Sequence, residues 1–234
     1  MRIIRRILSK FSQSAIVMLT NMFPEKGQIL MLHWIEDAPI NNDKEPYRIS
    51  VFQFKTLLSY LKQKRTIKLS DWEKENNFYA ITIDDVPESF YYNAYPLLRE
   101  FGIPFTIFIN TTLLGKEGYI TEEQLILMSQ CDLCTIGSHG VNHCEFAFLT
   151  PQKIKEEFYD SKKYLESIIG REVTLFAFPY GTYYACGYRN KNLALDVYKY
   201  AFGTIPCPIS KPLFLKKYFL PRINVNTLYI QSLK

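Results

Sequence analysis

Four residues of the sequence have the types and the spacing of a hydrolytic metal centre. Asp84 and Asp85 are adjacent at the end of an apolar run, and His139 and His143 are four positions apart. Two neighbouring carboxylates repel each other and resist burial unless a cation or a proton separates them. Two neutral imidazoles and one carboxylate form an open three-ligand site that leaves a position for water. We therefore expect one aspartate to bind a cation and its neighbour to stay free as a base.

The segments around these side chains alternate between strand and helix patterns. Apolar runs predict strands at residues 28–35, 78–86, 103–110, 133–139, 173–181 and 200–205. Helical spacing and capping residues predict helices at residues 50–65, 89–102, 121–130, 150–170 and 190–200. This alternation indicates βαβ units and a parallel sheet, either open or closed into a barrel.

Unusual polar groups follow three of the predicted strands. The aspartate pair, His139 and the turn Pro179–Tyr180–Gly181 each lie at the carboxyl end of a strand. In α/β folds these ends meet at one rim, where catalytic groups gather. Taken alone, the histidines could be surface or core residues and the aspartates a solvated turn. Their joint occurrence at strand ends predicts a metal site on this rim.

Length and composition favour one α/β domain. The chain has 234 residues, of which 47% are apolar, enough for one sizeable core. We expect a single catalytic domain at residues 28–234, preceded by a helical extension at residues 1–27. The odd number of five cysteines and the lack of a clear export signal or transmembrane run favour a cytoplasmic protein.

The basic residues are too sparse to indicate a nucleic-acid partner. The net charge is +5, and the densest basic cluster consists of Arg2, Arg5, Arg6 and Lys10. This cluster could instead place the protein at the periphery of an anionic membrane. Nothing in the sequence indicates an obligate protein partner.

Three short motifs resemble those of the polysaccharide deacetylases of the NodB-homology type, carbohydrate esterase family 4. Residues 82–86 are similar to the family's T-F-D-D-G, residues 139–143 to H-[ST]-x-x-H, and residues 177–181 to R-x-P-Y-G. The resemblance extends over residues 28 to 226. It implies a distorted (β/α) barrel and a metal-dependent hydrolase that removes acetyl groups, usually N-acetyl, from amino sugars.

The first two motifs imply the metal ligands and the base. By resemblance, Asp85, His139 and His143 hold a divalent cation, which we expect to be zinc, with cobalt or nickel as alternatives. Asp84 is then the general base that takes a proton from the attacking water.

The third motif implies the substrate-binding turn. The backbone N–H of Tyr180 would stabilise the developing oxyanion together with the metal. Gly181 would let the turn, which includes Pro179, approach the substrate. The implied substrate is an amino-sugar glycan or a sugar–lipid intermediate.

Three features depart from the family's motifs. Val86 replaces a glycine, which matters if this position needs a positive φ. Ala177 replaces the arginine that orients the base; Arg222 could reach the same carboxylate or be an ordinary surface arginine. No histidine follows His143, so the late L-x-H motif with its general acid is absent.

The remaining histidine, His33, is a candidate for the missing acid. It lies at the end of the first predicted strand, on the same rim if the strands are parallel. It could equally be a core or rim histidine, with the proton coming from water or a partner chain. These departures keep a second function open: a deacetylase-like domain that binds glycan or a partner protein without turnover.

Overall fold

Seven parallel strands form the central sheet. The computed structural model describes residues 15–20, 22, 27–37, 46–187, 190–210, 214 and 217–233. The strands are β1 (Gln28–Leu32), β4 (Tyr79–Asp84), β5 (Phe105–Ile109), β6 (Cys134–Ser138), β7 (Leu175–Ala177), β8 (Tyr200–Phe202) and β9 (Ile223–Asn224). They lie in the order β8-β7-β6-β5-β4-β1-β9, and every neighbouring pair is parallel. The predicted parallel sheet is therefore confirmed.

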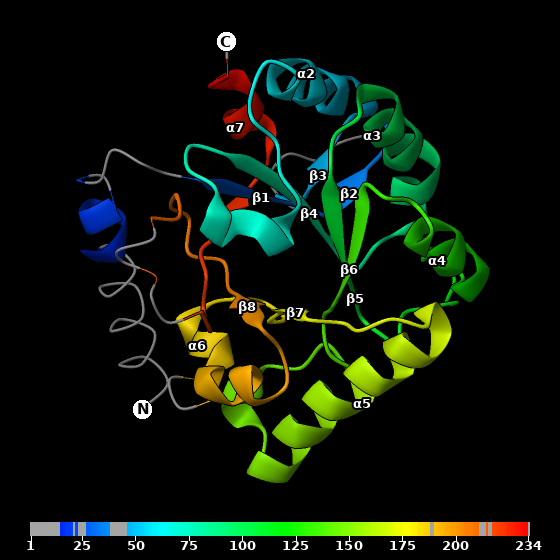
Figure 1. The fold of residues 1–234 in the computed structure, drawn as a ribbon, viewed down its shortest axis with the longest axis vertical. Helices are drawn as coiled ribbons and strands as arrows, with labels where there is room; N and C mark the ends of the chain where they lie inside the picture. The colour runs from blue at the N-terminus through cyan, green and yellow to red at the C-terminus, as the bar shows by residue number, and fades with distance from the viewer. Residues whose placement is uncertain are drawn as a thin grey trace.

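Helices cover the outer face of this sheet. Figure 1 shows α2, α3, α4 and α5 around the outside of the curled strands. The α-helices after β3 are α2 (Val51–Leu61), α3 (Tyr95–Phe101), α4 (Glu122–Ser129), α5 (Pro151–Ile169), α6 (Tyr183–Cys186) and α7 (Thr227–Gln231). The arrangement is a curled half-barrel, which confirms the expected distorted (β/α) barrel.

Residues 217–220 connect the two edges of the curled sheet. The N–H of Ala201 in β8 donates to the carbonyl of Lys217, and the N–H of Leu220 donates to the carbonyl of Ala201, both at 2.9 Å. The same segment continues into β9, which pairs with β1 at the opposite edge. Arg222 therefore lies in the short connection between the two edges.

Local sequence signals fix the starts of the longer helices. Ser50 and Thr121 each form a capping box at the start of α2 and α4. Thr150 caps α5, which ends at Gly170 with φ +66°. These side chains satisfy backbone N–H groups that have no partner within the helix.

Two predicted helices differ from the structure. The helix predicted at residues 89–102 contains a π-helix, η2 (Phe90–Ala94), which is followed directly by α3. Pro96 cannot donate to the carbonyl of Tyr92, so the regular helical ladder is interrupted there. The helix predicted at residues 190–200 is instead the 3-10 helix η4 (Lys191–Asp196). Tyr200 already belongs to β8, which pairs with β7, so only a short segment is left for a helix.

The predicted strand at residues 28–35 divides into two. β1 ends at Leu32, and β2 (Trp34–Ile35) pairs with β3 (Arg48–Ile49) in a separate two-stranded sheet. His33 lies at the break, directly after the carboxyl end of β1. The two 3-10 helices not yet named are η1 (Leu69–Lys74) and η3 (Phe146–Phe148).

Most of the predicted N-terminal extension, residues 1–27, lies outside the described residues, although residues 15–20 are helical. The basic cluster at Arg2, Arg5, Arg6 and Lys10 also lies outside them, and membrane contact through it stays a prediction. None of the described helices has the length and hydropathy needed to cross a bilayer.

Candidate metal centre

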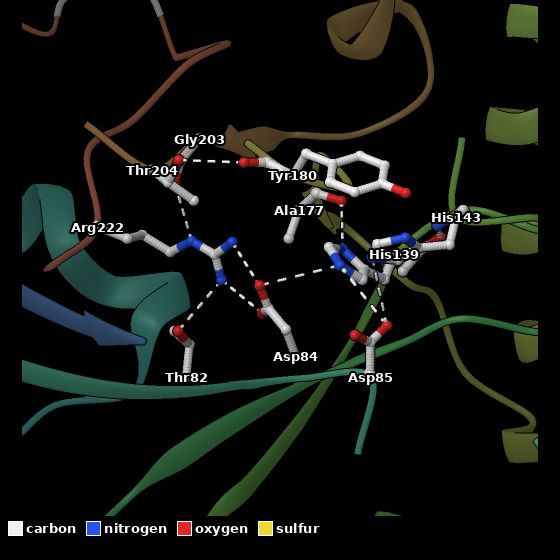
Figure 2. Close-up of polar contacts among 12 residues, drawn as sticks. Thr82, Asp84, Asp85, His139, His143, Ala177, Tyr180, Gly203, Thr204 and Arg222 are labelled. Carbon is white, nitrogen blue, oxygen red and sulfur yellow. Dashed lines mark hydrogen bonds and ion pairs between the residues drawn. The ribbon is translucent and has the colours of Figure 1, made fainter. Parts of the chain in front are cut away.

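The parallel strands bring the predicted site residues to one rim. β4 ends at Asp84, β6 ends immediately before His139, and β7 ends just before the turn that contains Tyr180. These three strands come from different parts of the chain, and their carboxyl ends point the same way because all are parallel. Figure 2 shows the side chains close together at this rim.

Asp85, His139 and His143 form a compact set of ligand atoms. One ligand atom from each residue lies within 4.8 Å of the others. Asp85 Oδ1 is 3.9 Å from His139 Nε2 and 3.7 Å from His143 Nε2. This oxygen is buried and has no hydrogen-bond partner among the described residues. A buried carboxylate oxygen facing two imidazole nitrogens fits a divalent cation with an open coordination position.

The protein fixes the orientation and the tautomer of His139. The ring is buried, and its Nδ1 lies 2.8 Å from the carbonyl oxygen of Ala177. Because a carbonyl only accepts, Nδ1 carries the hydrogen and Nε2 keeps its lone pair toward Asp85. Burial lowers the pKa of His139, which favours the neutral imidazole that a metal requires.

His143 lies at the end of a tight loop that begins at His139. Its backbone has φ +51°, a left-handed conformation that is uncommon outside glycine. The ring packs edge-on against Tyr180, with 4.7 Å between the ring centroids. Burial lowers the pKa of His143 as well. Both imidazoles are therefore suited to binding a cation at neutral pH.

Asp84 is locked in a two-pronged ion pair with Arg222. The two Arg222 nitrogens Nη1 and Nη2 donate to Asp84 Oδ1 and Oδ2 at 2.6 and 2.7 Å. Arg222 is fully buried and also donates from Nε to the carbonyl of Gly203 at 3.0 Å. Of the two alternatives for Arg222, the structure thus has the one that reaches the aspartate.

The two neighbouring aspartates have opposite electrostatic surroundings. Burial alone would raise the pKa of Asp84, but the charge and hydrogen bonds of Arg222 outweigh it and hold this pKa at about 2. Burial, with the nearby charge of Asp84, raises the pKa of Asp85. Arg222 keeps Asp84 ionised without a metal ion, whereas Asp85 has no ion pair with an arginine or lysine among the described residues.

A strained turn directs both carboxylates to the same rim. Successive side chains of a strand point to opposite faces, but Asp85 and Val86 leave the strand geometry with φ +58° and +48°. Val86 is fully buried, and its N–H donates to the carbonyl of Asp84 at 2.6 Å. The position where the family's motif has glycine does require a positive φ here, and a valine occupies it.

The Tyr180 turn is held firmly beside the predicted metal ligands. Tyr180 and Gly181 have φ +59° and +57°, and the Tyr180 side chain is 54% exposed. Thr204 clamps the turn: its N–H donates to the Gly181 carbonyl at 2.7 Å, and its hydroxyl donates to the Tyr180 carbonyl at 3.3 Å. A Cβ at position 181 would lie 2.3 Å from Thr204 Cγ2, so only glycine fits. Pro179 is buried beneath this turn.

His33 lies near the site but does not belong to the set of Asp85, His139 and His143. Its ring packs against those of Trp34 and Tyr47, at centroid distances of 5.7 and 4.8 Å, and its Nδ1 has no hydrogen-bond partner among the described residues. Burial lowers the pKa of His33 to about 4, against the opposing charge of Asp84. His33 is therefore neutral at pH 7.

Sequence analysis missed one residue of the site, Glu157 on α5. It is buried, with 4% of its surface exposed, and it contacts the loop between His139 and His143. The signal was present in the sequence. Position 157 belongs to the buried stripe of α5 that also contains Ile154, Phe158 and Leu165, and an acidic residue on an apolar stripe needs a partner.

The chain is similar in sequence to known polysaccharide deacetylases. Residues 72–196 match the family model for polysaccharide deacetylase, more than half of the chain. YxkH of Bacillus subtilis strain 168, which is named as a polysaccharide deacetylase, is 29% identical over 170 residues, covering 68% of this chain and 58% of that protein. The poly-β-1,6-N-acetyl-D-glucosamine N-deacetylase of Staphylococcus aureus strain N315 is 29% identical over 140 residues, covering 54% of this chain and 46% of that protein.

Solved structures share the fold at lower identity. The Streptococcus pyogenes deacetylase PplD, solved with acetate, has a TM-score of 0.78 and 22% identity, covering 90% of this chain and 97% of that one. The Bacillus cereus polysaccharide deacetylase BC0361 has a TM-score of 0.78 and 21% identity, covering 90% and 70%. The chain spans about half the length of the curated relatives that it matches. By its motifs, its fold and the family model, the chain belongs to the polysaccharide deacetylase family.

Proposed function

We propose that the chain is a metal-dependent hydrolase that removes N-acetyl groups from an amino-sugar glycan or a sugar–lipid precursor. The observation that carries this proposal is the pairing of a metal-ligand set, Asp85, His139 and His143, with a separately held carboxylate on Asp84. The Staphylococcus aureus relative is named for N-deacetylation of poly-β-1,6-N-acetyl-D-glucosamine, which supports an N-acetyl substrate.

The ligand set favours zinc, with cobalt or nickel as alternatives. Two imidazoles and one carboxylate form the usual three-ligand set of hydrolytic zinc centres, and they leave one position open. A divalent cation held there supplies Lewis-acid activation of a water molecule and of the acetyl carbonyl.

Asp84 is the proposed general base. Its Oδ2 lies 3.9 Å from His139 Nε2, on the side of the metal ligands, and can accept a proton from the attacking water. The pairing with Arg222 keeps this carboxylate ionised and fixes its direction. The low pKa makes Asp84 a weak base. It therefore takes the proton while the water attacks the carbonyl, because the water becomes more acidic as its bond to carbon forms.

The Tyr180 turn is the proposed oxyanion and substrate site. The exposed Tyr180 side chain next to His143 lies where an acetylated sugar would approach the rim. The backbone N–H of Tyr180 is then the donor for the carbonyl oxygen as it becomes negative. The clamp between Thr204 and Gly181 keeps this donor in place before substrate binds.

His33 is the proposed donor of a proton to the leaving amine. The chain has three histidines, and the other two belong to the metal-ligand set. Because His33 is neutral in the free protein, the acid role requires its pKa to rise in the substrate complex. The low pKa of His33 is also the observation that favours the alternative function, glycan or partner binding without turnover.

Acetate release is the measurement that separates the two functions. Full-length protein loaded with zinc, and separately with cobalt, is incubated with N-acetylglucosamine oligomers and with acetylated sugar–lipid substrates. We expect released acetate, and a loss of about 100-fold or more in kcat for His33→Phe with metal content unchanged. Metal binding and oligomer binding without acetate release would instead establish a binding protein.

A further inference from the structure

The helix α5 carries two buried polar side chains one turn apart. Glu157 is 4% exposed and Ser161 is fully buried, although their neighbours on the same face are apolar. Burying a carboxylate is costly unless hydrogen bonds compensate for the lost water. The hydrogen-bond partners of Glu157 therefore indicate why a carboxylate is buried at this position.

Three donor groups of the loop between His139 and His143 form hydrogen bonds with the Glu157 carboxylate. Its Oε2 accepts hydrogen bonds from the N–H groups of Val141 and Asn142 at 2.7 and 3.1 Å. Its Oε1 accepts one from the Asn142 side-chain Nδ2 at 2.7 Å. An ionised carboxylate only accepts, which matches these three donors.

The rest of the loop is held from two further sides. The N–H of Gly140 donates to Ser138 Oγ at 3.1 Å, and that hydroxyl donates to Ser161 Oγ on α5 at 2.8 Å. On the opposite side, the carbonyls of Gly140 and Val141 accept from the N–H groups of residues 111 and 112, both at 3.1 Å. The backbone between the histidines thus has a partner at each of these positions.

Glu157 also fits closely against Gly140. This glycine has φ +81°, and a Cβ there would lie 2.9 Å from Glu157 Oε2. The carboxylate therefore occupies the space of the missing side chain. The loop and the helix are shaped for each other, and His143 reaches its left-handed conformation at the end of this constrained segment.

We propose that Glu157 is a positioning residue that sets the separation and orientation of His139 and His143 for metal binding. This inference rests on the proposed metal-dependent function. Glu157 touches neither the ligand atoms nor the substrate side of the site; it acts through the peptide groups of residues 141 and 142. Such outer-shell contacts typically change metal affinity 10- to 100-fold when removed.

Cobalt titration of the full-length chain tests this role. For Glu157→Ala we expect an affinity for Co²⁺ about 10- to 100-fold weaker than that of the wild type, and a changed Co²⁺ absorption spectrum, since the spectrum reports ligand geometry. Glu156→Ala is the matched control. Glu156 precedes it on α5, and among the described residues its side chain bonds with the exposed side chains of Lys153 and Gln152, so this variant should keep wild-type affinity and spectrum.

A charge-conserving swap guards against a variant that simply folds poorly. Asn142→Asp sets two carboxylates 2.7 Å apart and should weaken Co²⁺ binding about as much as Glu157→Ala. Glu157→Gln alone should change affinity less than about 3-fold, because the amide of Asn142 can turn to accept from the new amide. Combining Glu157→Gln with Asn142→Asp restores a donor–acceptor pair at the original net charge and should recover most of the affinity.

The outcomes distinguish this inference from the proposed function. Wild-type protein that binds Co²⁺ but releases no acetate would reject deacetylation and leave the positioning role intact. Folded Glu157→Ala with wild-type affinity and spectrum would overturn the positioning role alone, as would a double variant no better than Asn142→Asp. Wild-type protein that binds no divalent metal would overturn both.

Discussion

Asp84 and Asp85 are adjacent in the sequence, yet the two sides of the site that they belong to are built differently. On the arginine side, both oxygens of Asp84 are paired with Arg222, which is itself tied to Gly203. On the imidazole side, Asp85 Oδ1 is buried, has no hydrogen-bond partner within the described part of the chain and faces two neutral rings. The first side is complete in the protein alone, and the second lacks a positive charge.

This difference separates the roles of two chemically identical groups. A carboxylate that is already neutralised cannot gain much from a cation, so it is available to handle a proton. A carboxylate whose pKa is raised by burial gains the most from one. In the proposed function, the surroundings of each aspartate, and not its residue type, decide which one serves as the base and which one as the ligand.

Exchanging each aspartate for asparagine is the sharpest way to break the comparison. Asp84→Asn should lower kcat for acetate release by about 10²- to 10⁴-fold and change Co²⁺ affinity little, because the base is lost and the ligands remain. Asp85→Asn should lose metal affinity together with activity. Equal metal loss in both variants, measured by titration of the metal-free proteins, would mean that the two carboxylates share one role.

Removing the arginine tests whether the first side is complete only because of its ion pair. Arg222→Met leaves Asp84 buried and unpaired, which should lower the free energy of unfolding by about 3–5 kcal/mol. Arg65→Met is the control, since Arg65 forms an ion pair with Glu75 but is itself exposed. This variant should lower the free energy of unfolding by less than about 1 kcal/mol. Urea unfolding of both variants gives the comparison; similar losses would contradict it.

Acid unfolding of the metal-free protein reports on the same ion pair. The pKa of Asp84 is lowered to about 2 from an ordinary value of 3.8. Its contribution to stability is thus fully present above about pH 4 and is lost as the pH falls toward 2. The expected loss is about 2 kcal/mol. Asp84→Asn should lack this part of the pH dependence, whereas Asp71→Asn, which removes a carboxylate on η1, should keep it.

The turn between the two sides is expected to give the smallest effect. Val86 and Val173 are both fully buried, but only Val86 has a positive φ. Each Val→Gly change loses the same side chain, while Val86→Gly also relieves backbone strain. We expect Val86→Gly to be less destabilising than Val173→Gly by about 1–2 kcal/mol in urea unfolding. Equal losses would show that the turn is unstrained.

The sequence alone predicted the parallel sheet and the rim of the site because both depend on local patterns. Apolar runs and capping residues lie within one element, and the aspartates, His139 and the Tyr180 turn directly follow strands. The 3-10 helix at residues 191–196 was not foreseen, because its length is limited by where β8 pairs, which is a tertiary constraint.

Pairings between distant residues and backbone angles set the limit of such predictions. The sequence could not decide whether Arg222 reaches Asp84 or lies on the surface, since its bonds to Asp84 depend on the connection between the sheet edges. The sequence shows Glu157 as an acidic residue on an apolar stripe of α5, but its donors at residues 141 and 142 depend on how α5 packs against that loop. The positive φ of Val86 runs against the preference of valine and could only be stated as a condition.

The position of Arg222 in the chain has a consequence for how the protein is made. Arg222 and Asp84 are 138 positions apart, and Arg222 comes immediately before β9, which is the last strand of the sheet in chain order. During synthesis, the aspartates and histidines therefore emerge well before their counter-charge. Until β9 docks beside β1, the nascent rim holds unbalanced acidic groups and stays open to proteases and chaperones. The ion pair between Asp84 and Arg222 therefore forms only once the chain up to β9 has joined the sheet.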